Sequence, residues 1–356
     1  MILVKDSNIF QKVKRFLQTQ GMRNKFLCLG YSGGVDSTAL LYILLECQKK
    51  IPFSLLLAHV SHGWRPEGEE ETKKIVELCK DKKIPLFLHS MHIDYSLPNL
   101  EDRCRQERLQ FFYALYKNKS FELLLLAHQA DDQAETVLKR ILEGASLAKI
   151  GGLKEYSFYK EMPIGRPLLT IAKQSLYSYL LRCGIQPFED KTNIDPRFLR
   201  GRMRKDLFPI VEKIFQKNIR GNLCKLALYS KEVEEYLQRK IENFFLQLTV
   251  KEDIIRFDLS SFLHLEKIEV EFFIRKICDV MDQMLSFDQI QQFVNSILSG
   301  SYNKAFFSKD FVFQVHGKMI KIKNREKLQC NPLIMKNIGS KLQKMCELKD
   351  KFSTLC

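Results

Sequence analysis

The glycine-rich segment Ser32–Ser37, which reads SGGVDS, has the composition of a site for phosphate groups. Its two adjacent glycines let the backbone approach an anion closely. The segment follows the apolar run Phe26–Leu29 and precedes a stretch with helical spacing, Thr38–Lys49. Backbone N–H groups at a helix start attract anions, and the serine hydroxyls add donors. The alternative is an ordinary turn before a helix, with Ser37 as the N-cap. No Lys follows the glycines and the G-x-G-x-x-G pattern is absent, so neither a P-loop nor a dinucleotide fingerprint is present.

Three further polar segments stand at or just after apolar runs. They read HVSHGWR from His59, NLEDRCRQER from Asn99 and AHQADDQAET from Ala127. The apolar runs Phe26–Leu29, 53–60, 86–93 and 123–127 alternate with helix-like segments at 37–49, 67–80 and 100–116. This alternation predicts an α/β domain with a parallel sheet covered on both faces and right-handed crossovers. Ligands bind outside the carboxyl ends of such strands, so we expect the polar segments to converge on one crevice.

Composition limits the partners and the number of domains. A chain of 356 residues suggests two or three domains. The net charge of +15 favours a polyanionic partner, and residues 166–225 alone hold 13 basic and 5 acidic residues. We expect a first domain at 1–215, a mainly helical domain at 216–300 and a small strand-containing segment at 301–356, with a hairpin around His316 and Gly317. No apolar run is long enough for a membrane span, and the N-terminus does not resemble a signal peptide.

The ten cysteines contain no C-x-x-C pair, because the closest two are ten residues apart. A zinc ribbon and a thioredoxin-type redox pair are therefore excluded. We expect reduced thiols in a cytoplasmic protein.

The SGGVDS segment resembles the PP-loop of the ATP pyrophosphatase family, whose Rossmann-like members cleave ATP between the α and β phosphates. The order of the further segments resembles the tRNA(Ile)-lysidine synthase family over about residues 26–215. That family's pattern continues with a Gly-rich link, RPLL, an acidic segment and a basic segment. The corresponding positions here are Gly151-Gly152, Arg166–Leu169, Asp190–Asn193 and Arg200–Arg204. One departure is Gln129, which stands where the family has a second histidine.

The resemblance implies a ligase that works in two steps. ATP, with Mg²⁺, would activate C2 of the wobble cytidine in isoleucine tRNA with a CAU anticodon, releasing pyrophosphate. Free L-lysine would then displace AMP to give lysidine, which pairs with adenine instead of guanine. It implies no membrane partner. A homodimer is a possible assembly, and the elements that select the tRNA and the base that deprotonates lysine are left open.

Roles for single residues follow from the resemblance and their chemistry. The predicted catalytic residues are Asp36, Arg105, Arg108, His128 and Asp132. The predicted ATP-binding residues are Ser32, Gly33, Gly34, Val35, Asp36, Ser37 and His59. His62 is expected to lie with His59 beside the adenine or ribose, and Arg65 is given no role. The predicted tRNA-binding residues are Arg200, Arg202, Arg204 and Lys205. Asp36 and Asp132 are the predicted Mg²⁺ ligands.

Spacing adds to these assignments. His128 and Asp132 are four residues apart and would share one face of a helix, with Asp131 as a candidate N-cap. Arg105 and Arg108 are three apart on one helix and could clamp phosphate or the activated base. The alternatives are core histidines and a solvated basic face.

Two other functions fit parts of the pattern. A tRNA thiolase of the same superfamily would need catalytic or cluster-binding cysteines, typically as C-x-x-C, and the chain has none. A non-catalytic RNA-binding protein on a decayed PP-loop scaffold would not need to retain the loop, His128, Asp132 and the two arginines. Pyrophosphate release that depends on both lysine and tRNA separates these readings.

Overall fold

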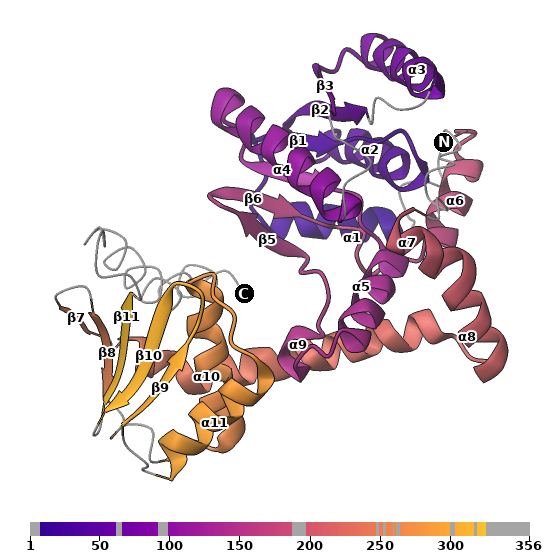
Figure 1. Ribbon diagram of the computed structural model, residues 1–356. Helices are drawn as coiled ribbons and strands as arrows, with labels where there is room; N and C mark the ends of the chain where they lie inside the picture. Colours follow the sequence, from indigo (N-terminus) through magenta and orange to yellow (C-terminus); the bar gives the residue numbers. More distant parts are fainter. Residues whose placement is uncertain are drawn as a thin grey trace. The chain divides into compact units, whose positions relative to one another are not determined.

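The computed structural model describes residues 8–61, 66–91, 99–186, 197–246, 249–251, 254–258, 260, 264–299, 303–316 and 319–324. The chain divides into two compact units, residues 1–230 and 231–356. Each unit has its own sheet (Figure 1).

The first unit is built on a six-stranded sheet with the strand order β3-β2-β1-β4-β6-β5. Its strands are β1 (Phe26–Gly30), β2 (Ser54–Ser61), β3 (Leu86–Ser90), β4 (Leu123–Leu126), β5 (Tyr156–Tyr159) and β6 (Met162–Gly165). The first four strands and β6 pair in parallel, and only β5 pairs antiparallel, with β6. The predicted parallel sheet is confirmed, and β5 and β6 extend it beyond the four predicted strands.

Helices cover both faces of this sheet (Figure 1). They are α1 (Asn8–Thr19), α2 (Val35–Gln48), α3 (Pro66–Lys82), α4 (Leu100–Lys119), α5 (Ala130–Leu142) and α6 (Lys173–Arg182). Side chains of β1 alternate between two cores, because successive residues of a strand point to opposite faces. Leu27 and Leu29 pack with α1, α2, α3 and α6. Cys28 packs on the other face with Phe112 and Leu115 of α4.

The remainder of the first unit is helical. The one-turn helix α7 (Leu199–Arg202) continues through a π-helical turn, η4 (Met203–Leu207), into α8 (Phe208–Phe215). Met203 and Phe208 pack against Ala134 of α5. This packing holds the basic segment against the start of α5. A short 3-10 helix, η2 (Leu147–Lys149), follows α5, and the long helix α9 (Ile219–Leu246) begins in the first unit.

The second unit contains a five-stranded antiparallel sheet of order β7-β8-β11-β10-β9 and the helices α10 (Lys267–Val280) and α11 (Phe287–Leu298). The strands are β7 (Thr249–Lys251), β8 (Ile254–Asp258), β9 (Lys304–Phe307), β10 (Phe311–His316) and β11 (Met319–Asn324). The predicted hairpin is present as β10 and β11. Residues 226–300 are less helical than predicted, because β7 and β8 lie within them. The division at 215 and 300 stays a prediction.

Candidate functional site

The SGGVDS loop joins the buried strand β1 to helix α2, as predicted. The helix begins at Val35, earlier than the predicted Thr38. Gly34 is its N-cap and forms no side-chain cap hydrogen bond, so the interpretation of Ser37 as N-cap is wrong. Gly33 has φ +84°, a backbone conformation that a residue with a Cβ adopts only with strain. The loop thus presents uncapped helix N–H groups, which is the arrangement that binds anions.

Side-chain hydroxyls hold the loop in this shape. Ser37 accepts a hydrogen bond from the Ser32 backbone N–H (3.2 Å), its hydroxyl lies 3.1 Å from the Ser32 hydroxyl, and it donates to the Gly34 carbonyl (3.2 Å). Thr38 donates to the Gly33 carbonyl at 3.0 Å. The Gly33 and Gly34 carbonyls therefore point into hydrogen bonds within the loop and α2, while the N–H groups of Ser32 and Gly34 donate to the hydroxyls of Ser37 and Ser32.

Two buried side chains, those of Tyr31 and His59, lie next to the loop. The Tyr31 hydroxyl lies 3.2 Å from the Thr38 hydroxyl, and a ring nitrogen of His59, Nδ1, lies 2.9 Å from the Tyr31 carbonyl oxygen. Burial lowers the pKa of His59, against the effect of this hydrogen bond. The structure thus places His59 next to the loop, at the end of β2, as a neutral side chain that contacts its backbone.

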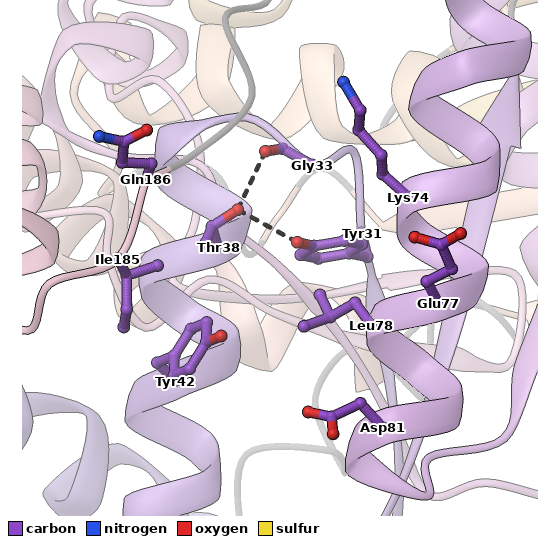
Figure 2. A pocket seen from close by; sticks show the side chains of 10 residues that line it. All are labelled: Tyr31, Gly33, Thr38, Tyr42, Lys74, Glu77, Leu78, Asp81, Ile185 and Gln186. Atoms are coloured by element: carbon purple, nitrogen blue, oxygen red, sulfur yellow. Dashed lines mark hydrogen bonds between the residues drawn. The ribbon is translucent and has the colours of Figure 1, made fainter.

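A pocket of about 360 Å³ adjoins the loop (Figure 2). It is lined by Tyr31, Gly33, Thr38 and Tyr42, by Lys74, Glu77, Leu78 and Asp81 of α3, and by Ile185 and Gln186. Its lining contains none of the predicted catalytic residues, so it neighbours the loop and is separate from the groups with reactive chemistry.

Asp36 lies in the first turn of α2 and has a buried oxygen, Oδ1, without a hydrogen-bond partner among the described residues. Burial raises the pKa of Asp36 to about 7. The carboxylates of Asp132 and Asp131 add to this rise, whereas Lys173 and Arg204 oppose it. A carboxylate that is costly to ionise, with an unused oxygen, is a group that a bound cation would stabilise.

Helix α5 begins at Ala130. Its N-cap is Gln129, which accepts a hydrogen bond from the Asp131 N–H (2.6 Å), while the Gln129 N–H donates to Asp132 (3.0 Å). Two expectations are therefore wrong: Asp131 is not the N-cap, and His128 precedes the helix and does not share a helical face with Asp132. The capping box also gives Gln129, the departure from the family pattern, a structural role.

Two arginines of the basic segment, Arg200 and Arg204, form ion pairs with Asp132 of α5. Arg204 Nη2 lies 2.8 Å from Asp132 Oδ1 and 2.9 Å from Glu135 Oε2. Arg200 Nε lies 3.0 Å from Glu101 Oε1 of α4, and its Nη1 lies 3.8 Å from Asp132 Oδ1. A tRNA phosphate at either arginine would compete with these carboxylates. Arg202 and Lys205 are exposed.

Arg105 and Arg108 share the start of α4, and neither forms a hydrogen bond or ion pair within the described ranges. Burial and repulsion from neighbouring guanidinium groups lower the pKa of both. His128 lies among them: burial, followed by Arg166, Arg108, Arg200 and Arg105, lowers its pKa well below the usual value. A neutral histidine inside a guanidinium cluster makes a site for an anion.

The sequence analysis did not predict the long-range contacts of two buried side chains, Gln133 and Arg166. Gln133 binds both sides of the Gly151-Gly152 link, donating to the Gly151 carbonyl (3.1 Å) and accepting from the Leu153 N–H (2.7 Å). Arg166 is buried and donates to the Lys154 carbonyl and the Ser157 hydroxyl, both at 2.8 Å. The contacts span 9 to 20 residues, so no local pattern could reveal them.

Some predicted features fall outside the described residues, namely His62, Arg65 and the segment 190–193. The seven described cysteines are free thiols. Of the described helices, none is long and apolar enough to cross a membrane. No group of three or more His, Cys, Asp or Glu side chains that could hold a metal occurs in the described ranges. Mg²⁺ usually binds through one or two carboxylates plus substrate phosphates, so Asp36 and Asp132 beside a phosphate loop still fit this ion.

Comparison with known proteins agrees with this geometry. A family model described as a PP-loop domain matches residues 5–211. A tRNA(Ile)-lysidine synthase from Chlamydia muridarum is 36% identical over 274 residues, which cover 75% of this chain and 81% of the relative. The chain belongs to the tRNA(Ile)-lysidine synthase family. The family consists of ATP-dependent ligases that modify tRNA, within the PP-loop class.

Two other relatives carry the same name. The tRNA(Ile)-lysidine synthase family member from Protochlamydia amoebophila is 34% identical over 76% of this chain, and the matched region spans 59% of that relative's length. The Chlamydia pneumoniae member is 38% identical over 66% of this chain and 72% of its own length. A solved structure, the U34-tRNA thiolase NcsA from Methanococcus maripaludis with its [4Fe-4S] cluster, has a TM-score of 0.53 at 20% identity, covering 63% of this chain and 78% of the thiolase. That likeness concerns the fold alone.

Proposed function

We propose that this chain ligates free L-lysine to C2 of the wobble cytidine in isoleucine tRNA with a CAU anticodon, at the expense of ATP. The observation that carries the proposal is the electrostatic proximity of a phosphate loop, two carboxylates and a guanidinium cluster, in a chain of this family. The product would be lysidine, and codon recognition would change from AUG to AUA.

In the first step, ATP binds with its β and γ phosphates at the N–H groups of the SGGVDS loop. The cytidine oxygen O2 attacks the α phosphorus, and the bond from that phosphorus to the bridging oxygen breaks. The electron pair stays on the leaving pyrophosphate, and the cytidine becomes adenylated. Arg105 and Arg108 face the negative charge that develops on the α phosphate, because both guanidinium groups are unpaired within the described ranges.

Mg²⁺, when bound, would neutralise phosphate charge and bridge phosphate oxygens to the protein. Asp36 would hold it through its unpartnered oxygen. Asp132 is the second candidate ligand, but it already binds the Gln129 N–H and Arg204. Its use as a ligand requires that Arg204 move toward Glu135, which it also contacts.

In the second step the ε-amine of lysine attacks C2 of the adenylated cytidine and AMP leaves. The carboxylates of Asp36 and Asp132 attract the lysine ammonium before it loses its proton. His128 is neutral in this site, so it can accept or donate a hydrogen bond to the base without adding charge. The group that removes the proton is not assigned.

The tRNA is proposed to reach the site over the basic segment. Arg202 and Lys205 are exposed and would contact the phosphate backbone, whereas Arg200 and Arg204 would have to exchange a carboxylate for phosphate. We place the enzyme in the cytoplasm. A homodimer stays a prediction.

The test uses purified protein, Mg-ATP, radiolabelled lysine and transcripts of isoleucine tRNA and methionine tRNA with the same anticodon. The proposal expects pyrophosphate release and stable lysine incorporation with the isoleucine tRNA only. Asp132→Asn should abolish incorporation, and Asp206→Asn, which changes an exposed carboxylate of the π-helical turn, should leave it unchanged.

The other outcomes separate the alternatives. Pyrophosphate without lysine incorporation would mean that ATP is used with a different acceptor, as in a tRNA thiolase. Neither product would favour a non-catalytic RNA-binding protein.

A further inference from the structure

Lys173 is a lysine that neither the sequence motifs nor the predicted site includes. It is the first residue of α6 and is half-buried. Within the described part of the chain, its side chain forms no hydrogen bond and no ion pair. A cation at a helix start is opposed by the helix dipole, and a half-buried one loses solvation. Nothing in its own helix offsets these costs, because the first turn of α6 holds no acidic residue.

The fold brings Lys173 to the phosphate loop. Helix α6 packs on α2, and Leu176 and Leu180 share a core cluster with Leu40 and Leu44. The two helices run in the same direction, since Lys173 faces Asp36 near their starts and Tyr179 faces Cys47 near their ends.

A backbone hydrogen bond from the Ala130 N–H to the Ile171 carbonyl (3.0 Å) ties the start of α6 to the start of α5. The first turns of α2, α5 and α6 therefore meet around Asp36. Lys173, the first residue of α6, lies in one of these first turns and acts on the Asp36 carboxylate.

The other cations of the site are already occupied or lie elsewhere. Arg204 also acts on Asp36, but it is held by Asp132 and Glu135. Arg105 and Arg108 act on His128, and Lys173 is not among the charges that do so. Lys173 is thus a cation beside Asp36 that forms no ion pair in the described part of the chain.

We propose that Lys173 binds the β and γ phosphates of ATP at the loop and stabilises the pyrophosphate as it leaves. This inference rests on the proposed function, since it requires that ATP be cleaved between its α and β phosphates. When that bond breaks, the bridging oxygen keeps the electron pair and pyrophosphate gains negative charge. Lys173 keeps its proton and donates a hydrogen bond to this charge, which grows in the transition state.

The test compares Lys173→Met and Lys173→Arg with Lys12→Met. Lys12 is a nearby control, because its ammonium lies 3.4 Å from the Thr170 hydroxyl, just before α6, and it is not among the charges with the largest effects on Asp36. The readouts are the rate of pyrophosphate release, the KM for ATP and the inhibition constant of added pyrophosphate.

Lys173→Met should lower kcat for pyrophosphate release about 100-fold, the usual effect of removing one preorganised donor, and weaken pyrophosphate inhibition about tenfold or more. Lys173→Arg should restore most of both, and Lys12→Met should leave both within about twofold of the parent. If Lys173→Met stayed folded and matched Lys12→Met in both readouts, the inference would be overturned.

Failure of the proposed function gives a different result. The parent protein would then release no pyrophosphate with any tRNA and lysine. Binding of magnesium pyrophosphate to the parent and to Lys173→Met, measured by calorimetry, still tests Lys173: equal affinities would contradict its role, and a tenfold loss would support it.

Discussion

Replacing Asp36 by Asn should stabilise the ligand-free protein while it removes activity. Burial raises the pKa of Asp36 from 3.8 to about 7, so the folded state holds a proton that the unfolded chain has released. Between these two pH values stability falls as pH rises, because the folded state binds the extra proton. Above pH 7 the ionised carboxylate costs the folded state about 4 kcal/mol at most, at 1.36 kcal/mol per pKa unit over about three units.

The change is large enough to measure by thermal unfolding. For a unit of this size, about 1 kcal/mol shifts Tm by about 2–4 °C, so Asp36→Asn should raise Tm by about 10 °C at pH 8. At pH 4 the two proteins should unfold within about 2 °C of one another, since Asp36 is then protonated in the folded state. Asp206→Asn is the matched control. The reasoning is refuted if Asp36→Asn lowers Tm at pH 8 or gives the same shift at both pH values.

Three further substitutions test the loop and the guanidinium cluster. Gly33→Ala places a Cβ on a residue with φ +84°, which should lower the free energy of unfolding by about 1–2 kcal/mol and weaken ATP binding. Unfolding and calorimetry measure the two effects, and an unchanged ATP affinity would show that the loop shape is not required. Tyr31→Phe removes the hydrogen bond to Thr38 and should cost about 1 kcal/mol with kcat within about threefold, so a large fall in kcat would give Tyr31 a direct role. Arg108→Gln should lower kcat/KM for pyrophosphate release about 100-fold. Arg103 is exposed on the same helix, so Arg103→Gln should leave kcat/KM unchanged. Equal effects of the two substitutions would show that Arg108 does not act in the site.

The parts of the fold that sequence could predict have local signals. The strands β1 to β4 are continuous apolar runs, and the loop after β1 carries two adjacent glycines and serines. Strand β6 was missed because its sequence, MPIG, contains a proline and a glycine, which are uncommon inside strands. Strand β6 lies between β4 and β5, and it pairs in parallel with β4, where Leu124 is opposite Ile164.

The candidate site shows the same limit. The residue types at Asp36, Arg105, Arg108, His128 and Asp132 could be chosen from sequence, but their partners could not. In the sequence, Arg204 belongs to a run of basic residues that is typical of an exposed surface. In the structure it forms a hydrogen bond with Glu135, which is 69 residues away in the chain.

Lys173 lies outside every motif and is brought to Asp36 only by the packing of α6 on α2. Long-range ion pairs and packing of this kind leave no periodic or local pattern in the sequence.

The most direct test of the account is mass analysis of the modified tRNA. After reaction with Mg-ATP and lysine, the isoleucine tRNA is digested to nucleosides, and the mass of the nucleoside from the wobble position is measured by mass spectrometry. The account predicts a nucleoside heavier by one lysine less one water, absent when ATP is omitted and absent with the methionine tRNA. An unmodified cytidine, or lysine found at the 3′ end of the tRNA, would contradict it.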